Sequence, residues 1–448
     1  MDEEKEAPTP LNFRSTEPNP EKPFDGDLFG RKALADRLTG MIGRLTEGCV
    51  LAIDAPWGEG KSWFGKNWAN DLRQKGYRVA FIDAFRQDYV EDPFLMLCAE
   101  VLPLVREDEG ERSKLAEVGA KVTRNLIPIS KSLANSVFHS LLAKVGLANG
   151  VQEIAEIVAK GTIDIGARLV VERLENHAQE KKSVEEFANL LGQAAAREEK
   201  PLVIFIDELD RCRPDFAMRT VERIKHFFDV PKVIFVLLVN RRQLEAAVRG
   251  LYGNEIDAET YLGKFVLAWI GLPKADREWV GTLRRYRLYC DYLVKKFGLD
   301  RDREHDGFCV IFTELADFFE LSLRDMERGF VIYSLAQPLY GRKGFTAWAI
   351  FLKLYRQDIC VGVINGNPKA HEEAINIVEI LKKRKEKFYL IPSIEDLHRL
   401  GAKIIRENEI SDQTKKLIDD LYGNTPCSNE GEFLPWLFAR INPGCQIE

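Results

Sequence analysis

The chain has 448 residues, 45% of them hydrophobic and 30% charged, and its formal net charge is −6. This composition is typical of a soluble globular protein long enough for roughly three domains. The acidic balance argues against a surface built to grip nucleic acid, so we expect no sequence-specific nucleic-acid partner.

The first 26 residues are rich in Pro, Glu and Asn and lack apolar periodicity, so they predict a disordered lead-in over 1–26. The acidic start, Met1 to Lys5, does not fit a signal peptide. The eight cysteines form no C-x-x-C pair and fit a reducing compartment. We therefore expect a cytoplasmic protein.

Four short apolar runs dominate the first half of the chain. A helix through Leu34 and Leu38 precedes them, and the runs cover residues 49–53, 79–82, 202–206 and 233–239. Continuous apolar runs that alternate with helical patterns predict a mostly parallel sheet buried on both faces, which places the chain in the α/β class. Ligands bind such sheets at the carboxyl ends of the strands.

A long segment separates the second and third runs, and we predict a helical insertion at about 105–198. Its longest charge-free run, 132–143, has 12 residues, whereas a membrane span needs ~20. No transmembrane segment is therefore expected. The favoured interpretation is a helical hairpin packed on the core, and an amphipathic element facing a partner or a membrane surface is the alternative.

The pattern becomes helical from about residue 276 to the end of the chain, which predicts an all-helical C-terminal part. The turn residues from Asn365 to Pro368 indicate a boundary within it. We therefore predict a P-loop core over 27–275, a helical lid over 276–365 and a C-terminal helical region over 366–448.

The loop after the first apolar run carries the strongest functional signal. Residues 55–62 read APWGEGKS, which fits G-x-x-x-x-G-K-[ST] except that Ala55 replaces the first glycine. Glycines allow a turn whose amides cradle phosphate, and the following helix adds its positive end. Lys61 is predicted to reach the β- and γ-phosphates, and Ser62 to bind Mg²⁺. The predicted nucleotide-binding residues are Pro56, Trp57, Gly58, Glu59, Gly60, Lys61, Ser62 and Trp63.

A second acidic signal follows the third apolar run. Asp207 ends an apolar strand, where a charged side chain needs a partner such as a hydrated Mg²⁺. Glu208 is predicted to orient or deprotonate the attacking water. The predicted catalytic residues are therefore Lys61, Asp207 and Glu208, and the predicted metal ligands are Ser62 and Asp207. A helix N-cap by Asp207, or by Asp210 on the same loop, is the alternative interpretation.

Four further residues are sensor candidates. Asn240 ends the fourth run and could touch the γ-phosphate, with a strand-ending turn as the alternative. Arg211 follows the acidic pair on the same loop. Arg324 and Arg328 share one face of a predicted helix, and a solvated pair bonded to neighbouring acids is their alternative interpretation.

These segments resemble the KAP family of P-loop NTPases, an AAA+-like branch common in bacteria. The resemblance rests on the APWGEGKS loop, on IDAF at 82–85 and on FIDELDRCRPDF at 205–216, and it covers about residues 28–335. It implies an α/β core followed by a helical domain, with Lys61 and Ser62 holding phosphate and Mg²⁺ and Asp207 and Glu208 as the Walker B pair. Two positions depart from the family. Asn240 is more often aspartate, and Gly263-Lys264 replaces a basic pair.

Together these features predict an ATPase that uses ATP and Mg²⁺ to drive a conformational or assembly switch. The resemblance adds antiviral defence as an expected role, because some members take part in phage exclusion. A protein partner or self-association is expected, and peripheral membrane contact is kept as an alternative. The competing hypothesis is a nucleotide-gated scaffold with little hydrolysis.

Overall fold

The structure, a computed structural model, describes residues 17–90, 93–104, 185–193, 195–225, 230–274, 282–299, 303–336, 343–383, 391–403, 409, 411, 412, 414 and 433–441. The chain divides into two compact units, which we describe separately. The first, Glu17–Pro273, is called the core unit, and the second, from Lys274 onward, is called the helical unit.

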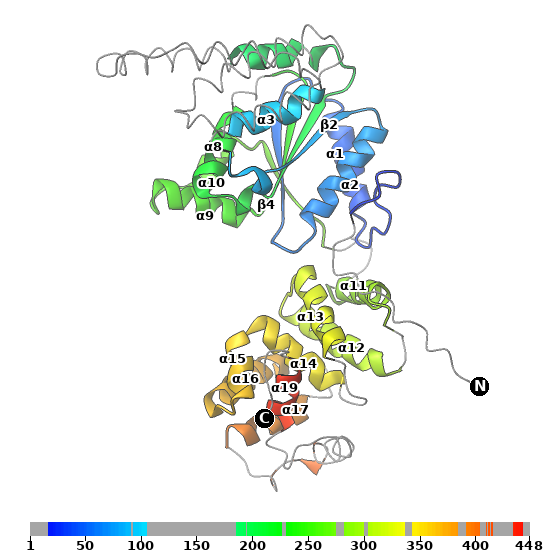
Figure 1. Ribbon diagram of the computed structural model, residues 1–448, viewed down its shortest axis with the longest axis vertical. Coiled ribbons are helices and arrows are strands. Elements are labelled where there is room, and N and C mark those ends of the chain that lie inside the picture. The colour runs from blue at the N-terminus through cyan, green and yellow to red at the C-terminus, as the bar shows by residue number, and fades with distance from the viewer. Residues whose placement is uncertain are drawn as a thin grey trace, which may run out of the picture. The chain divides into compact units, whose positions relative to one another are not determined.

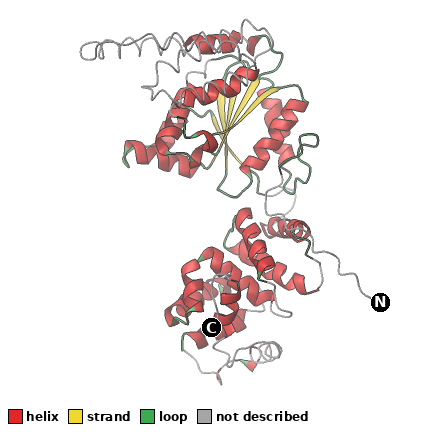
Figure 2. Ribbon diagram, viewed as in Figure 1, coloured by secondary structure: helices red, strands yellow, loops and turns green. Residues whose placement is uncertain are grey.

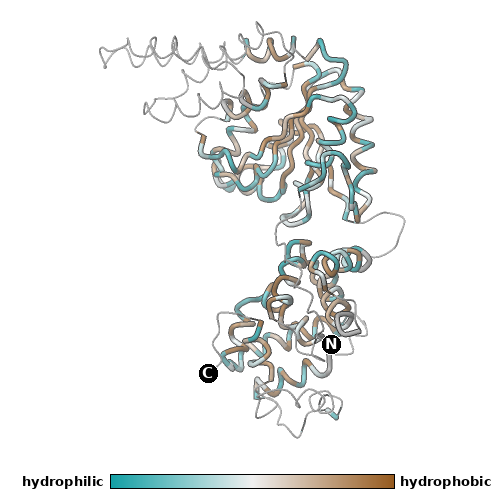
Figure 3. The backbone as a smooth tube through the Cα atoms, turned by 45° about the vertical axis from the view of Figure 1, so that its right-hand side comes forward, coloured by the Kyte–Doolittle hydropathy of each residue, from teal (hydrophilic) through white to brown (hydrophobic). Residues whose placement is uncertain are grey.

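A parallel five-stranded sheet forms the centre of the core unit, in the order β2-β3-β4-β1-β5. The continuous apolar runs predicted as strands lie in it because both faces of the sheet are covered. Figure 3 shows these strands as the most hydrophobic part of the unit. The strands are β1 (Cys49–Asp54), β2 (Arg78–Asp83), β3 (Leu202–Asp207), β4 (Val233–Val239) and β5 (Ala268–Gly271).

Helices cover the two faces of the sheet, so the core unit has three layers (Figure 1). Side chains alternate between the faces along each strand. Leu51 and Phe205 pack in the cluster under α1 (Arg31–Ile42) and α2 (Lys61–Gln74). Ala52 and Ile204 pack on the opposite side, in the cluster that includes α3 (Pro93–Val101), α8 (Pro214–Ile224), α9 (Arg241–Tyr252) and α10 (Ala258–Gly263). The predicted α/β fold class is confirmed.

Short 3₁₀ turns and one further helix complete the described part of the core unit. The turns are η1 (Phe85–Gln87), η2 (Leu102–Leu104) and η4 (Leu209–Arg211), and residues 185–193 are helical. Most of the predicted insertion at 105–198 lies outside the described residues. β5 was not predicted as a strand, although it lies in the continuous apolar run 265–272; it is a four-residue edge strand that is only partly buried.

The end of the predicted lead-in is folded. Phe24 is 6% exposed, and its ring makes edge contacts with Trp63 and Phe64 at centroid distances of 5.9 and 6.1 Å. Its amide donates to Oδ1 of Asn67 at 2.6 Å. The prediction of disorder over 1–26 is therefore wrong for residues 17–26, and residues 1–16 lie outside the described part.

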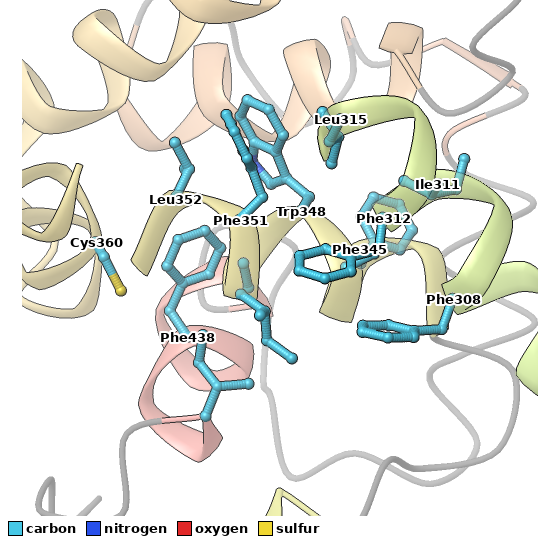
Figure 4. Close-up of a cluster of buried hydrophobic side chains, with 14 of the residues drawn as sticks. Phe308, Ile311, Phe312, Leu315, Phe345, Trp348, Phe351, Leu352, Cys360 and Phe438 are labelled. Carbon is cyan, nitrogen blue, oxygen red and sulfur yellow. The ribbon is translucent and has the colours of Figure 1, made fainter. Parts of the chain in front are cut away.

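The described secondary structure of the helical unit consists of helices alone (Figure 2). Figure 4 shows how aromatic rings from α12, α14 and α19 fill its interior. Phe308, for example, stacks on Tyr333 and Phe312. The α-helices in its described residues are α11 (Thr282–Lys296), α12 (Arg303–Phe318), α13 (Leu323–Leu335), α14 (Lys343–Tyr355), α15 (Gln357–Ile364), α16 (Pro368–Lys382), α17 (Ile391–Gly401) and α19 (Phe433–Arg440).

The predicted boundary at residues 365–368 is a turn inside one hydrophobic core. Val363 before the turn and Ala374 after it belong to the same buried cluster. Asn367 caps α16 by accepting a hydrogen bond from the amide of Lys369 at 3.1 Å. Residues on both sides of this turn therefore belong to one compact unit.

Among the residues that the structure describes, no helix combines the length and the apolar character that crossing a membrane requires.

Candidate nucleotide site

The phosphate-loop sequence lies between a strand and a helix at the carboxyl edge of the sheet. β1 ends at Asp54, and α2 begins at Lys61. Gly58 and Gly60 have φ values of 84° and 81°, in the left-handed region that only glycine adopts without strain. A Cβ atom at Gly60 would also lie 2.8 Å from Nη1 of Arg31. Both glycines are therefore required by the backbone of this loop.

Lys61 is folded back under the loop. Its ammonium group donates to the carbonyl oxygens of Ala55 at 2.7 Å and Pro56 at 3.3 Å, and the residue is 8% exposed. Burial lowers the pKa of Lys61, while the nearby carboxylates of Asp210 and Asp207 act in the opposite direction. The charge is thus held next to the loop and to the first-turn amides of α2, which have no acceptors within the helix.

Arg31 braces the outer side of the loop and was not predicted as a site residue. Its guanidinium donates to the carbonyl oxygens of Glu59 at 2.8 Å, Gly60 at 3.4 Å and Pro273 at 3.4 Å. A buried arginine that satisfies loop carbonyls from outside fixes the direction of the peptide groups. The sequence offers no local signal for this role, because Arg31 reads as an ordinary residue at the start of a helix.

The two predicted metal ligands are in contact. Asp207 ends β3 and is 4% exposed. Its carboxylate is hydrogen-bonded by Ser62 of α2 and accepts the amide of Glu208 at 2.9 Å. The pKa of Asp207 is raised to about 6, mainly by burial and to a smaller extent by the charges of Glu208 and Asp83, while the hydrogen bond from Ser62 opposes the rise. A hydroxyl and a carboxylate at this spacing suit Mg²⁺, which takes few protein oxygens and keeps several waters.

The predicted base has a strained backbone and a charged partner. Glu208 has φ 60°, in the left-handed region, although it carries a side chain. Its Oε1 accepts a hydrogen bond from Nη1 of Arg211 at 2.6 Å. Two of the residues predicted for the site, the base and one sensor candidate, therefore form an ion pair within a single turn.

The tryptophan of the loop reaches the same turn. The Trp57 indole donates to Oδ2 of Asp210 at 2.5 Å, although 153 positions separate them. Trp57 itself is 42% exposed. This contact links the phosphate loop to the segment after β3, and sequence spacing gives no signal for it.

Asn240 lies between these two segments, because β4 is the strand between β1 and β3. Asn240 is the N-cap residue of α9, and its side chain makes no capping hydrogen bond, so its role as a sensor stays a prediction beside the strand-ending turn. The neighbouring Arg241 amide donates to Oδ1 of Asp54 at 2.9 Å, which ties the end of β4 to the end of β1. The side chain of Trp63 packs against Phe24 in the core, so its backbone amide is the group left for a phosphate.

Arg324 and Arg328 lie on α13 of the helical unit. Both are exposed. Nη1 of Arg328 lies 3.5 Å from Oδ1 of Asp325, which is a neighbouring acid as in the alternative interpretation. Their role as sensors stays a prediction.

Comparisons with known proteins agree with this geometry. A family model described as "KAP family P-loop domain" matches residues 31–383, which extends past residue 335, where the sequence resemblance ended. No curated protein gave a significant match. Two solved structures of the Aeropyrum pernix ORC2 protein are similar, one as ADPNP–ADP complexes and one in an ADP form. They are 12% and 11% identical, with TM-scores of 0.34 and 0.32, and each covers 98% of this chain and 97% of its own.

Proposed function

The chain belongs to the KAP family of P-loop domains, and on that premise we propose that it is a Mg²⁺-dependent ATPase. The observation that carries the proposal is the contact between Ser62 and Asp207 beside Lys61. These three residues come from two distant segments, and they bring together a hydroxyl, a carboxylate and an ammonium group. That combination of groups is what binding a magnesium triphosphate requires.

Each residue has a role in the proposed reaction, in which water attacks the γ-phosphorus of ATP and the bond to the ADP oxygen breaks. Lys61 and the loop from Pro56 to Trp63 hold the phosphates. Ser62 and Asp207 hold Mg²⁺, which when bound neutralises the charge that develops on the leaving oxygens. Glu208 orients the water and accepts its proton, and Asn240 contacts the γ-phosphate or the water.

We further propose that this turnover drives a conformational or assembly switch. The helical part, predicted as a lid over 276–365 and a C-terminal region over 366–448, would be the moving element. The expected setting is the cytoplasm, with a protein partner or a second copy of the chain, and a role in antiviral defence rests on analogy with the family alone.

A second candidate is a nucleotide-gated scaffold that binds ATP and turns it over slowly. The ion pair between Glu208 and Arg211 supports it, because a base that is already paired is not free to accept a proton. The replacement of the family's usual residues by Asn240 and by Gly263-Lys264 supports it as well.

Calorimetry and a phosphate-release assay on the full chain test both candidates. We expect Lys61→Ala to abolish binding of MgATP and Glu208→Gln to keep binding but lose turnover. Lys66→Ala is the matched control, because Lys66 lies on the same helix and is exposed at the surface. Binding without turnover in the unaltered chain would favour the scaffold. No detectable heat with any magnesium nucleotide would refute both.

A further inference from the structure

The turn that follows the Walker B pair holds two opposite charges against the nucleotide site. Asp210 and Arg211 are adjacent in η4. Asp210 accepts a hydrogen bond from the Trp57 indole at 2.5 Å, and Arg211 donates a hydrogen bond to Glu208 at 2.6 Å. One short turn thus contacts both the phosphate loop and the predicted base.

Asp210 also acts on the lysine that is expected to bind phosphate. Among the carboxylates that raise the pKa of Lys61 against the effect of burial, Asp210 is the strongest, followed by Asp207 and Asp54. Its charge is thus placed where it interacts with the ammonium group that a γ-phosphate would need. The hydrogen bond from Trp57 holds Asp210 in this position. Burial does not explain where the indole lies, because Trp57 is 42% exposed.

The pairing of Arg211 with Glu208 has the complementary effect. The guanidinium of Arg211, at 2.6 Å, occupies Oε1 of this carboxylate. In this arrangement, the negative charge of Asp210 acts on the phosphate lysine, and the positive charge of Arg211 pairs with the predicted base.

Given the proposed ATPase function, we propose that the Leu209–Arg211 turn is a latch that the terminal phosphate of ATP displaces. The incoming negative charge repels Asp210 and breaks its hydrogen bond with Trp57. The same charge attracts Arg211, which leaves Glu208 and releases the carboxylate to act on water. The latch makes the base available only when a triphosphate is bound, since a nucleotide without that phosphate supplies no charge at this position.

Affinity measurements with MgATP, MgADP and AMP test the latch. Asp210→Asn removes the charge and keeps an oxygen that can accept from Trp57, whereas Trp57→Phe removes the donor. Both variants are expected to bind MgATP on the order of tenfold more tightly, because the closed latch opposes binding. The increase in affinity should be smaller for MgADP and absent for AMP. A general structural effect would not follow the number of phosphates in this way.

Two controls sharpen the result. Asp215→Asn removes an equal charge from the next helix, α8, and is expected to leave all three affinities unchanged. The double variant Trp57→Phe, Asp210→Asn should bind MgATP no more than twofold more tightly than the tighter single variant, because both changes open one latch.

Unchanged or weakened MgATP binding in Asp210→Asn would overturn the latch, and so would an equal gain for ATP and AMP. If the unaltered chain binds no nucleotide, the proposed function fails instead. The two failures are therefore distinguishable. A nonhydrolysable ATP analogue should also change Trp57 emission, and no difference between the unaltered chain and Trp57→Phe in that signal would contradict the release of the indole.

Discussion

Two buried histidines predict that the helical unit loses stability in mild acid. His371 and His398 are 1% and 0% exposed, and their Nδ1 atoms are 3.0 Å apart. The Trp348 indole donates to Nε2 of His398 at 3.0 Å. Because an indole nitrogen can only donate, His398 carries its proton on Nδ1 and donates it to His371. Both rings are therefore neutral when folded, and protonating either ring disrupts this chain of hydrogen bonds.

The pKa values set the size of the effect. Burial lowers the pKa of His371 from 6.5 to about 4, and burial together with His371 lowers that of His398 well below its ordinary value. As the pH falls below 6.5, the histidines bind protons in the unfolded chain and stay neutral in the folded chain. The free energy of unfolding therefore decreases until about pH 4. His371 alone would lose about 3 kcal/mol over this interval. That is a large part of the stability of an ordinary domain.

Hydrogen exchange of α14 in low urea, corrected for intrinsic rates, measures this loss between pH 7 and pH 5. The double variant His371→Gln, His398→Gln is the reference, because it removes both titrations and leaves the carboxylates of the unit in place. As the pH falls from 7 to 5, the free energy of opening of α14 should decrease more steeply in the unaltered chain than in the double variant. Equal slopes would refute the reasoning. NMR titration gives a second check that needs no variant, because two histidine rings should remain neutral down to pH 5.

Three further changes have defined outcomes. Gly65→Ala should destabilise the core unit by about 1–3 kcal/mol in urea unfolding, because the new Cβ atom would lie 2.1 Å from Cδ1 of Leu238. Gly40→Ala is the control: its Cβ atom would meet no neighbour, so it should stabilise α1 by about 0.5–1 kcal/mol. Phe24→Ala should cost about 3 kcal/mol, and a neutral result would restore the prediction of a disordered lead-in. Arg31→Met should weaken MgATP binding about tenfold in calorimetry, and unchanged affinity would show that the loop keeps its shape without the guanidinium.

The strands and the position of the glycine-rich loop between a strand and a helix could be predicted because their signals are local. Burial on both faces leaves continuous apolar runs such as Val233–Val239, and the strand-loop-helix order around Lys61 is contiguous in sequence. Asp207 is recognisable for the same reason, since it directly follows an apolar strand. For Asp207 and Glu208, the predicted Walker B pair, the prediction used only the type of residue and its position at the end of the strand.

The remaining features depend on packing between distant segments. Phe24 looks like one aromatic residue in a polar stretch, and its contact with Trp63 comes from the fold. The pairing of Trp57 with Asp210 spans 153 positions, and nothing in either local sequence specifies it. Each of these cases requires knowledge of which segments meet.

Arg31 connects three parts of the chain that the sequence keeps apart: the start of α1, the phosphate loop and the last residue of the core unit. The structural support of the proposed nucleotide site therefore extends to α1, a helix with no proposed contact to phosphate or metal. An N-terminal truncation that removed α1 would leave the glycine-rich sequence intact while depriving Glu59 and Gly60 of their guanidinium donor. A fragment that keeps the shape of the glycine-rich loop must accordingly begin ahead of it, because Arg31, which holds the loop carbonyls, precedes the loop in the chain.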